Sequence, residues 1–289
     1  MRFERPTIGL ALSGGAARGV AHVGVLRALT ETEIPIDCIA GTSAGSLVGG
    51  AFAAGLPVDD IAEFALKLRW RDIGRVTMSR LGVQSNERLE QYLRTRLPIT
   101  KFEELPIPFA AVATELKTGG AVVLRDKGDV PFAIRASCTI PGWYVPVVDE
   151  EGRQLVDGGL VAVIPSSVAR ALGADIVIAV DVNAAGATFI GPSNSVIGVL
   201  VQSLLVVQKT ASHYQLEMAD VVIKPQVGHI RWDEMGRSDE LMAAGYAAGL
   251  ESIPAIKTLI DEAVKAQPKW YQLRRRRNLP IKRTLSLPT

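Results

Sequence analysis

Hydrophobic and polar positions follow two rhythms along the chain, and together they predict a sheet covered by helices. Short β-branched runs at 7–12, 36–40 and 175–182 have the length and the flanking turn residues of buried strands. Residues 20–31 and 165–173 instead carry apolar side chains at helical spacing. Strands that alternate with helices are typical of a mostly parallel sheet with helices on both faces. The pattern therefore predicts an α/β fold.

Further elements are expected between and after these segments. They are a small-residue helix at 44–55, a mainly helical insert at 58–97, strands at 107–116 and 121–126, a helix at 130–138, a hairpin at 144–159, a long helix at roughly 193–217, a strand at 219–225 and a last helix at roughly 237–265. No internal repeat and no linker rich in Pro, Gly or Ser divides the chain. We expect one α/β domain over residues 1–265 and a basic, flexible tail over 266–289.

Composition supports a core-forming domain and places the positive charge at one end. Of the 289 residues, 48% are hydrophobic and 21% are charged, and the formal net charge is +2. No acidic residue follows Glu262, whereas eight basic residues lie between Lys265 and Arg283. Such a run is usually a solvated tail, and peripheral contact with an anionic membrane is the alternative. We expect no nucleic-acid partner, and the oligomeric state stays open.

Cysteine usage and hydropathy bear on the compartment. Cys38 and Cys138 lie in apolar segments and match no metal-ligand spacing, which favours reduced thiols in a reducing compartment. The first fifteen residues contain too short an apolar run for a secretory signal. The longest apolar stretch, 195–207, is interrupted by polar residues and is shorter than the ~20 residues that cross a bilayer, so we expect a core helix there. We expect a cytoplasmic protein without a metal or cofactor.

One serine stands between two glycines where a predicted strand meets a predicted helix. Ser43 lies in the sequence GTSAG, between Gly41 and Gly45. This is the context of a nucleophile elbow, in which a tight turn presents the hydroxyl at a helix N-terminus that favours negative charge. The glycines leave room where backbone segments approach each other. From the pentapeptide alone, a serine that caps the helix is an equal alternative.

A second glycine-rich turn, GGAARG at 14–19, joins the strand at 7–12 to the next helix. A dinucleotide-binding enzyme is the weakest interpretation, because Ala16 replaces the central glycine of the fingerprint and no acidic residue ends the next strand. Free N–H groups at a helix start bind negative charge. If Ser43 attacks an ester, these amides would form an oxyanion hole, and Arg18 would add a positive charge.

The chain has only three histidines that could accept the proton of Ser43. His22 and His213 lie in helical segments, where a packed or solvated histidine is the ordinary outcome. His229 would complete the order serine, aspartate, histidine found in α/β-hydrolases, and it stays open as an alternative.

Asp157 is the better candidate for the base. It ends a predicted strand and is followed by Gly158 and Gly159, which permit a sharp turn and a close approach of backbone segments. A carboxylate is a weak base, but burial raises its pKa, and a direct hydrogen bond to Ser43 would let it accept the proton. Alone, Asp157 is equally well explained as a turn residue.

These three motifs, in this order, resemble the patatin-like phospholipase family. That family carries a G-G-G-x-R-G oxyanion loop, a G-x-S-x-G nucleophile and a D-G-[AG] acid, which work as a Ser-Asp dyad without histidine. The corresponding segments here are GGAARG at 14–19, GTSAG at 41–45 and DGG at 157–159. The likeness is to the bacterial branch and covers roughly residues 7–183. The departure is Ala16, whose methyl group would crowd the oxyanion loop.

The resemblance implies a three-layer α/β sandwich and a role for each matched residue. Ser43 would be the nucleophile, and Asp157 the base that later protonates the leaving alcohol and activates water. Arg18 would steady the loop or its charge. The amides of the oxyanion hole would be those of Gly14, Gly15 and Ala16, and the turns would be supported by Gly19, Gly41, Gly45, Gly158 and Gly159.

The resemblance also implies an acyl ester of a lipid as the substrate, with phospholipase, lysophospholipase and esterase activities all open. Trp143, Tyr144 and the insert at 58–97 are candidates to line an acyl groove, and core packing is the alternative. A second class of function stays open as well, namely a weakly catalytic or non-catalytic protein that binds lipids or anions on the same fold.

Overall fold

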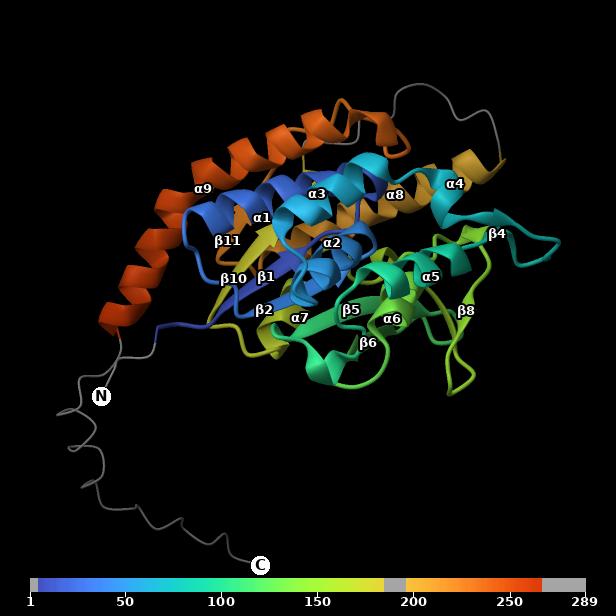
Figure 1. Cartoon of the computed structure of the whole chain (residues 1–289), viewed down its shortest axis with the longest axis horizontal. Helices are drawn as coiled ribbons and strands as arrows, with labels where there is room; N and C mark the ends of the chain where they lie inside the picture. The colour runs from blue at the N-terminus through green and yellow to red at the C-terminus, as the bar shows by residue number, and fades with distance from the viewer. Residues whose placement is uncertain (1–4, 185–195, 267–289) are drawn as a thin grey trace, which may run out of the picture.

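The computed structural model describes residues 5–184 and 196–266, and it places a mixed sheet between two layers of helices (Figure 1). The strand order of the central sheet is β11-β10-β1-β2-β5-β9-β8. The remaining strand, β6, pairs with β5 and is not part of this order. The strands are β1 Ile8–Leu12, β2 Cys38–Thr42, β5 Phe109–Glu115, β6 Ala121–Arg125, β8 Val147–Val148, β9 Gln154–Asp157, β10 Ile176–Val180 and β11 Val221–Ile223.

Strand β5 divides this sheet into a parallel and an antiparallel part. The strands β11, β10, β1, β2 and β5 run parallel to one another. Strand β6 is antiparallel to β5 along its outer edge, β9 is antiparallel to β5 along the inner edge beyond the end of β2, and β8 is antiparallel to β9. The predicted α/β fold with a mostly parallel sheet is therefore confirmed.

The helices alternate with the strands largely as the periodicity predicts. The α-helices are α1 Ala21–Glu31, α2 Ala44–Ala53, α3 Val58–Lys67, α4 Trp70–Ile73, α5 Glu87–Arg96, α6 Val130–Ser137, α7 Ser166–Ala171, α8 Val196–Leu216 and α9 Ser238–Ala266. Short 3-10 turns lie at η1 Ala16–Val20, η2 Phe102–Glu104, η3 Gly158–Leu160 and η4 Met235–Arg237. The Asp129 side chain caps α6 by accepting a hydrogen bond from the Phe132 amide at 2.9 Å.

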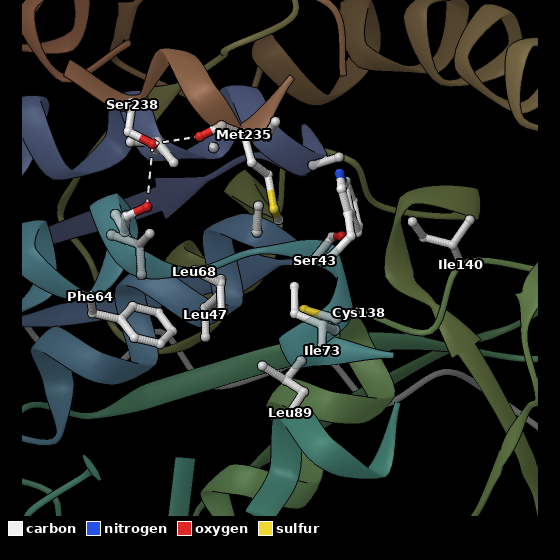
Figure 2. Close-up of a pocket in the computed structure, with 18 of the residues that line it drawn as sticks. Ser43, Leu47, Phe64, Leu68, Ile73, Leu89, Cys138, Ile140, Met235 and Ser238 are labelled. Atoms are coloured by element: carbon white, nitrogen blue, oxygen red, sulfur yellow. Dashed lines mark hydrogen bonds between the residues drawn. The ribbon is translucent and has the colours of Figure 1, made fainter. Parts of the chain in front are cut away.

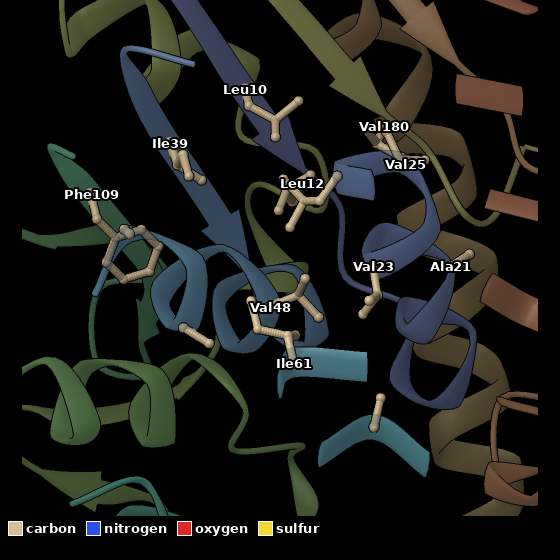
Figure 3. Packing of buried hydrophobic residues seen from close by; sticks show 14 of the residues in the cluster. Leu10, Leu12, Ala21, Val23, Val25, Ile39, Val48, Ile61, Phe109 and Val180 are labelled. Atoms are coloured by element: carbon tan, nitrogen blue, oxygen red, sulfur yellow. The ribbon is translucent and has the colours of Figure 1, made fainter. Parts of the chain in front are cut away.

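The two faces of the sheet are packed differently. On one face, large side chains such as Leu10, Leu12 and Ile39 meet Val48 of α2 in the main core (Figure 3). On the other face, small residues such as Ala11 and Ala40 lie beneath α7. This alternation follows from the pleat of the strands, which directs successive side chains to opposite faces.

The long helix α9 packs closely along α1, outside the first helical layer (Figure 1). Glycines make the approach possible, because a Cβ at Gly24 would lie 1.9 Å from the Met242 carbonyl oxygen and one at Gly245 would lie 1.9 Å from the Ala21 carbonyl oxygen. The predicted last helix is thus present. The tail beyond Ala266 lies outside the described residues.

Two expectations about secondary structure need correction. The insert at 58–97 is not only helical, because β3 Arg75–Val76 and β4 Gly82–Ser85 form a second, three-stranded sheet with β7 Gly142–Tyr144. The long apolar helix is not a core helix either. Several large side chains of α8 are exposed, namely Val199, Leu200, Val206, Val207 and Tyr214. Among the described residues, no helix is both long and apolar enough to span a bilayer.

Candidate active site

The sheet register brings the predicted nucleophile and the predicted base to the same level. Thr42, at the end of β2, pairs with Val112 of β5, so Ser43 follows at the level of Ala113. On the same edge of β5, just beyond the end of β2, Asp157 pairs with Ala113, because β6 pairs along the opposite edge from Ala110 to Thr114. No strand lies between Ser43 and Asp157, because β9 takes the place beside β5 that β2 leaves where the chain turns at Ser43.

The turn that carries Ser43 is strained and tightly packed. Ser43 has φ 51° and ψ −123°, a conformation that side-chain-bearing residues rarely adopt. A Cβ at Gly45 would lie 2.2 Å from the Leu12 carbonyl oxygen, so only glycine fits there. The Ser43 amide donates to the Ser137 hydroxyl at 2.8 Å, and that hydroxyl donates to the Val112 carbonyl oxygen at 2.6 Å. Helix α6 thereby holds the strained turn on β5.

The carboxyl group of Asp157 is buried, with 6% of the residue exposed. Burial raises its pKa to about 6, and hydrogen bonds from the Ser43 hydroxyl and from the Gly159 amide (2.8 Å) partly oppose that rise. Gly158 allows the turn after Asp157 to lie against β5, since a Cβ there would be 2.1 Å from the Val112 carbonyl oxygen. The result is a carboxylate that lines the same cavity as the serine and is more basic than an exposed aspartate.

The glycine loop lies beside Ser43 but offers fewer free amides than expected. An ideal Cβ at Gly14 would be 3.4 Å from the Ser43 Cβ, which places the loop against the serine. The Gly14 amide donates to the Val163 carbonyl oxygen at 2.9 Å, so it is not free to hold an oxyanion, which corrects the expectation. Within the described residues, the amides of Gly15 and Ala16 have no such partner. Ala16 has φ 48°, so it occupies a glycine-like conformation.

Arg18 supports the loop from behind and does not face Ser43. Its side chain is buried, and its Nε donates to the Ile230 carbonyl oxygen at 2.6 Å. Its Nη1 also contacts the Asn183 amide oxygen at 3.4 Å, and the Asn183 Nδ2 donates to the Gly14 carbonyl oxygen at 2.8 Å. Burial lowers the pKa of this guanidinium, and the nearby Glu234 carboxylate raises it. Arg18 therefore steadies the loop and does not add a charge beside Ser43.

The histidines are engaged elsewhere. His22 is fully buried and its Nε2 donates to the Ser13 carbonyl oxygen at 2.8 Å, while burial lowers its pKa to about 4. His229 is exposed and contacts the Glu240 carboxylate at 2.7 Å. The His213 ring packs near that of Tyr214. Among the described residues, no histidine contact with Ser43 or Asp157 is present, so the alternative base His229 is not placed to take the proton.

An apolar pocket opens on one side of Ser43 (Figure 2). Much of its wall comes from the insert, including Ile61, Phe64, Leu68, Ile73 and Leu89. The rest of the wall comes from the turns around Ser43 and from α2, β7 and the segment before α9, chiefly Ala16, Leu47, Cys138, Ile140, Tyr144 and Met235. We call this cavity the acyl pocket.

Trp143 and Tyr144, the two aromatic residues predicted to line an acyl groove, lie in different surroundings. Tyr144 lines the acyl pocket, and its buried hydroxyl has no hydrogen-bond partner within the described part of the chain. Trp143 is not part of that wall. Its ring meets the Trp232 ring edge to face, with the centroids 6.5 Å apart. Successive residues of a strand point to opposite faces, which is why only one of the pair reaches the pocket.

A second pocket opens on the Asp157 side of the same serine. Its wall contains Gly14, Gly15, Ala16, Ser43 and Asp157, together with Ile140, Pro141, Leu160, Leu204, Leu205, Gln208 and Trp232. We call it the distal pocket. The α8 residues in this wall carry no sequence signal, because nothing in an apolar helix indicates which side faces a site. Ser43 is therefore shared by two cavities that extend in different directions.

The comparisons with known proteins identify the family of the chain. The family model of patatin-like phospholipases matches residues 10–170, more than half of the chain, and the chain belongs to that family. An uncharacterized NTE family protein of Mycobacterium tuberculosis is 40% identical over 181 residues, which are 62% of this chain and 49% of the relative. Lysophospholipase NTE1 of Mycosarcoma maydis is 38% identical over 184 residues, which are 61% of this chain and 10% of that protein. The chain thus aligns with about half the length of the mycobacterial relative.

Two solved structures show the same fold at low sequence identity. VipD from Legionella pneumophila aligns with a TM-score of 0.50 at 14% identity, over 90% of this chain and 67% of that chain. Human GIVD cytosolic phospholipase A2, solved with methyl gamma-linolenyl fluorophosphonate, also aligns with a TM-score of 0.50, at 13% identity, over 92% of this chain and 60% of that chain. At these identities the likeness speaks for the fold alone.

Proposed function

We propose that this chain is a serine hydrolase of lipid acyl esters that works through Ser43 and Asp157. The observation that carries the proposal is that the strained Ser43 turn and the buried Asp157 carboxylate line one cavity together with Gly15 and Ala16, whose amides have no partner among the described residues. A hydroxyl, a base and donors for developing charge are the parts that acyl transfer requires.

The reaction runs in two steps. Asp157 accepts the proton of Ser43 as the hydroxyl oxygen attacks the ester carbonyl. The amides of Gly15 and Ala16 donate to the oxyanion, and each well-placed donor contributes about 3 kcal/mol to the transition state. Asp157 then protonates the departing alcohol, leaving an acyl group on Ser43. In the second step Asp157 takes a proton from water as the water oxygen attacks the acyl carbon. The bond between Ser43 Oγ and the acyl carbon then breaks, Asp157 returns the proton to Ser43, and the fatty acid is released.

The two pockets assign the two halves of the ester. The acyl pocket is walled by apolar side chains and suits a fatty-acid chain, whose burial from water is favourable. The distal pocket contains Asp157, so it suits the alcohol half, which must receive a proton as it leaves. The names of the relatives, lysophospholipase and patatin-like phospholipase, support a phospholipid or lysophospholipid as the substrate.

The test is covalent labelling followed by an ester panel. A fluorophosphonate probe should label the wild-type protein on Ser43, and Ser43→Ala should abolish both labelling and hydrolysis. The panel contains a phospholipid, a lysophospholipid and a neutral ester, each with one long acyl chain. His229→Ala serves as the matched control and should keep activity. Tight lipid binding without cleavage of any ester would contradict the proposal and favour a lipid-binding protein.

A further inference from the structure

An exposed apolar hairpin lies next to the acyl pocket. It consists of β3, β4 and the residues between them, and we call residues 75–85 the apolar hairpin. Met78 is fully exposed at its tip, and Val76 and Leu81 are 74% and 57% exposed. Single exposed apolar residues need no explanation, but a group of large ones on one projecting element indicates a binding surface.

The charge of this hairpin is entirely positive. Residues 75–85 contain Arg75 and Arg80 and no acidic residue. Within the described parts of the chain, neither arginine forms an ion pair with a carboxylate, although both are exposed. Guanidinium groups beside apolar side chains suit the boundary of a lipid layer, where the cation meets phosphate and the apolar group enters the acyl region.

The pairing of the hairpin fixes it beside the wall of the acyl pocket. Gln84 of β4 is in register with Tyr144 of β7, and Tyr144 lines the acyl pocket. Ile73, two residues before the hairpin, lines the same pocket. Figure 1 shows the loop that leads into β4 projecting from the body at the end where α4 and the start of α8 lie.

Helix α8 extends this surface toward the distal pocket. Leu200 lies close to β7, because an ideal Cβ at Gly142 would be 3.9 Å from its Cδ1. Val199 and Leu200 are 53% and 51% exposed. The same helix provides Leu204 and Gln208 to the distal pocket. One apolar surface thus borders both cavities that share Ser43.

We propose that the apolar hairpin, together with Val199 and Leu200 of α8, docks onto a lipid surface that carries anionic headgroups. Docking there would let an ester enter the acyl pocket without its acyl chain crossing water, whose contact with apolar groups is unfavourable. This surface lies in the folded body and is distinct from the basic tail. The purpose of docking rests on the proposed hydrolase function, whereas docking itself is measured without turnover.

The first experiment measures binding to vesicles in the full-length Ser43→Ala protein. Vesicles of phosphatidylcholine alone are compared with equimolar phosphatidylcholine and phosphatidylglycerol. Met78→Ser with Leu81→Ser should weaken partitioning roughly tenfold or more on the anionic vesicles. The matched control is Leu116→Ser with Val123→Ser, which removes two exposed apolar side chains near the turn between β5 and β6 and should leave partitioning unchanged.

The charge contribution is tested separately. Arg75→Gln with Arg80→Gln should weaken partitioning roughly tenfold on the anionic vesicles and little on phosphatidylcholine, with the difference shrinking at high salt. Lys117→Gln with Lys127→Gln removes the same charge from exposed positions elsewhere and should have a smaller effect. Equal loss in the two double variants would overturn a specific role for the hairpin arginines.

A fluorescent dye on the hairpin tests whether the hairpin itself contacts the lipid, and so distinguishes docking through the hairpin from binding through the tail. An environment-sensitive dye on Ser79→Cys should shift to the blue and be quenched by brominated lipids. The same dye on Thr118→Cys, in the exposed turn after β5, should not respond. The proposal is overturned if the two dyes respond alike, or if Met78→Ser with Leu81→Ser alters self-association and leaves vesicle binding intact.

In the catalytically active background, the hairpin variants should lose activity on vesicles while keeping activity on a soluble short-chain ester. Loss of both activities would indicate damage to the site. Absence of any ester hydrolysis in the wild type would contradict the proposed function, yet the vesicle and dye measurements would still decide whether the hairpin docks.

Discussion

The neighbouring strands β1 and β2 both end in glycine-containing turns, and the two turns present different chemical groups to the same cavity. After β1, the chain turns through Gly14 and Gly15 and presents backbone amides. After β2, it turns at Ser43 and presents a side-chain hydroxyl. Both turns contain one non-glycine residue with positive φ, Ala16 at 48° and Ser43 at 51°. In the proposed mechanism, these parallel neighbours with similar positive φ supply complementary parts, amides that bind negative charge and a hydroxyl that attacks the ester.

The largest expected effect is that of Asp157→Asn, which removes the proposed base of Ser43 and leaves the backbone of both turns unchanged. An asparagine cannot accept the serine proton, so we expect turnover to fall by roughly 10³ to 10⁴. The Asp157→Asn variant should also be more stable than the wild type at high pH. The pKa of Asp157 is raised from 3.8 to about 6 in the fold, so its contribution is most favourable below 3.8 and is lost as pH rises through about 6.

Removing this charge should therefore stabilise the protein by up to ~3 kcal/mol at pH 8, with little difference at pH 4. Denaturant unfolding of wild type and Asp157→Asn at both pH values measures this directly. A variant that is inactive and also less stable at pH 8 would show that the carboxylate has a structural role instead.

A pair of glycine substitutions sharpens the contrast between the two turns. In Gly45→Ala, the new methyl group would lie 2.2 Å from the Leu12 carbonyl oxygen, so we expect a loss of ~3 kcal/mol or more in stability. In Gly14→Ala, the nearest atom is the Ser43 Cβ at 3.4 Å, so the fold should persist while reactivity falls. Thermal unfolding and fluorophosphonate labelling of both variants separate the two outcomes. Equal stability of the two variants would count against the close packing of the Ser43 turn.

The pH profile of the wild type tests the base with no substitution at all. Asp157 must be ionised to accept a proton, and burial holds its pKa at about 6. We expect kcat/KM on a soluble ester to rise about tenfold per pH unit below that value and to level off above it. His229→Ala should leave the profile unchanged. An inflection that disappears in this variant would assign the titration to the histidine.

The smallest expected effect concerns the first turn. Ala16→Gly relieves a positive φ that costs an alanine about 1 kcal/mol, although glycine adds flexibility to the unfolded chain. Ala17→Gly, one residue later, removes a methyl group without relieving any positive φ. We expect the first variant to be more stable than the second by ~1 kcal/mol in denaturant unfolding. The reverse order would mean that the conformation of Ala16 carries no strain.

Local patterns were sufficient to predict most of the architecture. The β-branched runs and helical periodicities identified β1, β2, β5 and β10 and the helices between them, because each element is long enough to show its period. The strands β3 and β4 are short and largely exposed, so they carry no such period. Their order depends on pairing with β7, some sixty residues away, which no local window contains.

The site was predicted to a similar depth. Ser43 and Asp157 stood out because glycines follow each of them at the end of a strand. The hydrogen bond from the Gly14 amide to the Val163 carbonyl oxygen could not be predicted from the sequence, because it joins turns about 150 residues apart. Ser137, which holds the Ser43 amide, was missed for the same reason. Sequence motifs identify which groups belong to a site, whereas their remaining hydrogen-bond capacity is decided by tertiary contacts.

The position of Ser43 between two cavities has a practical consequence. The insert contributes a part of the acyl pocket that the distal pocket lacks, whereas the Asp157 turn and α8 contribute only to the distal pocket. If the chain hydrolyses esters as proposed, substitutions at Phe64 or Leu89 change which acyl chain length fits and leave the alcohol half of the ester unaffected. Substitutions at Leu204 or Gln208 then do the opposite. Under that proposal, chain length and headgroup choice are open to separate engineering, with Ser43 and Asp157 unchanged.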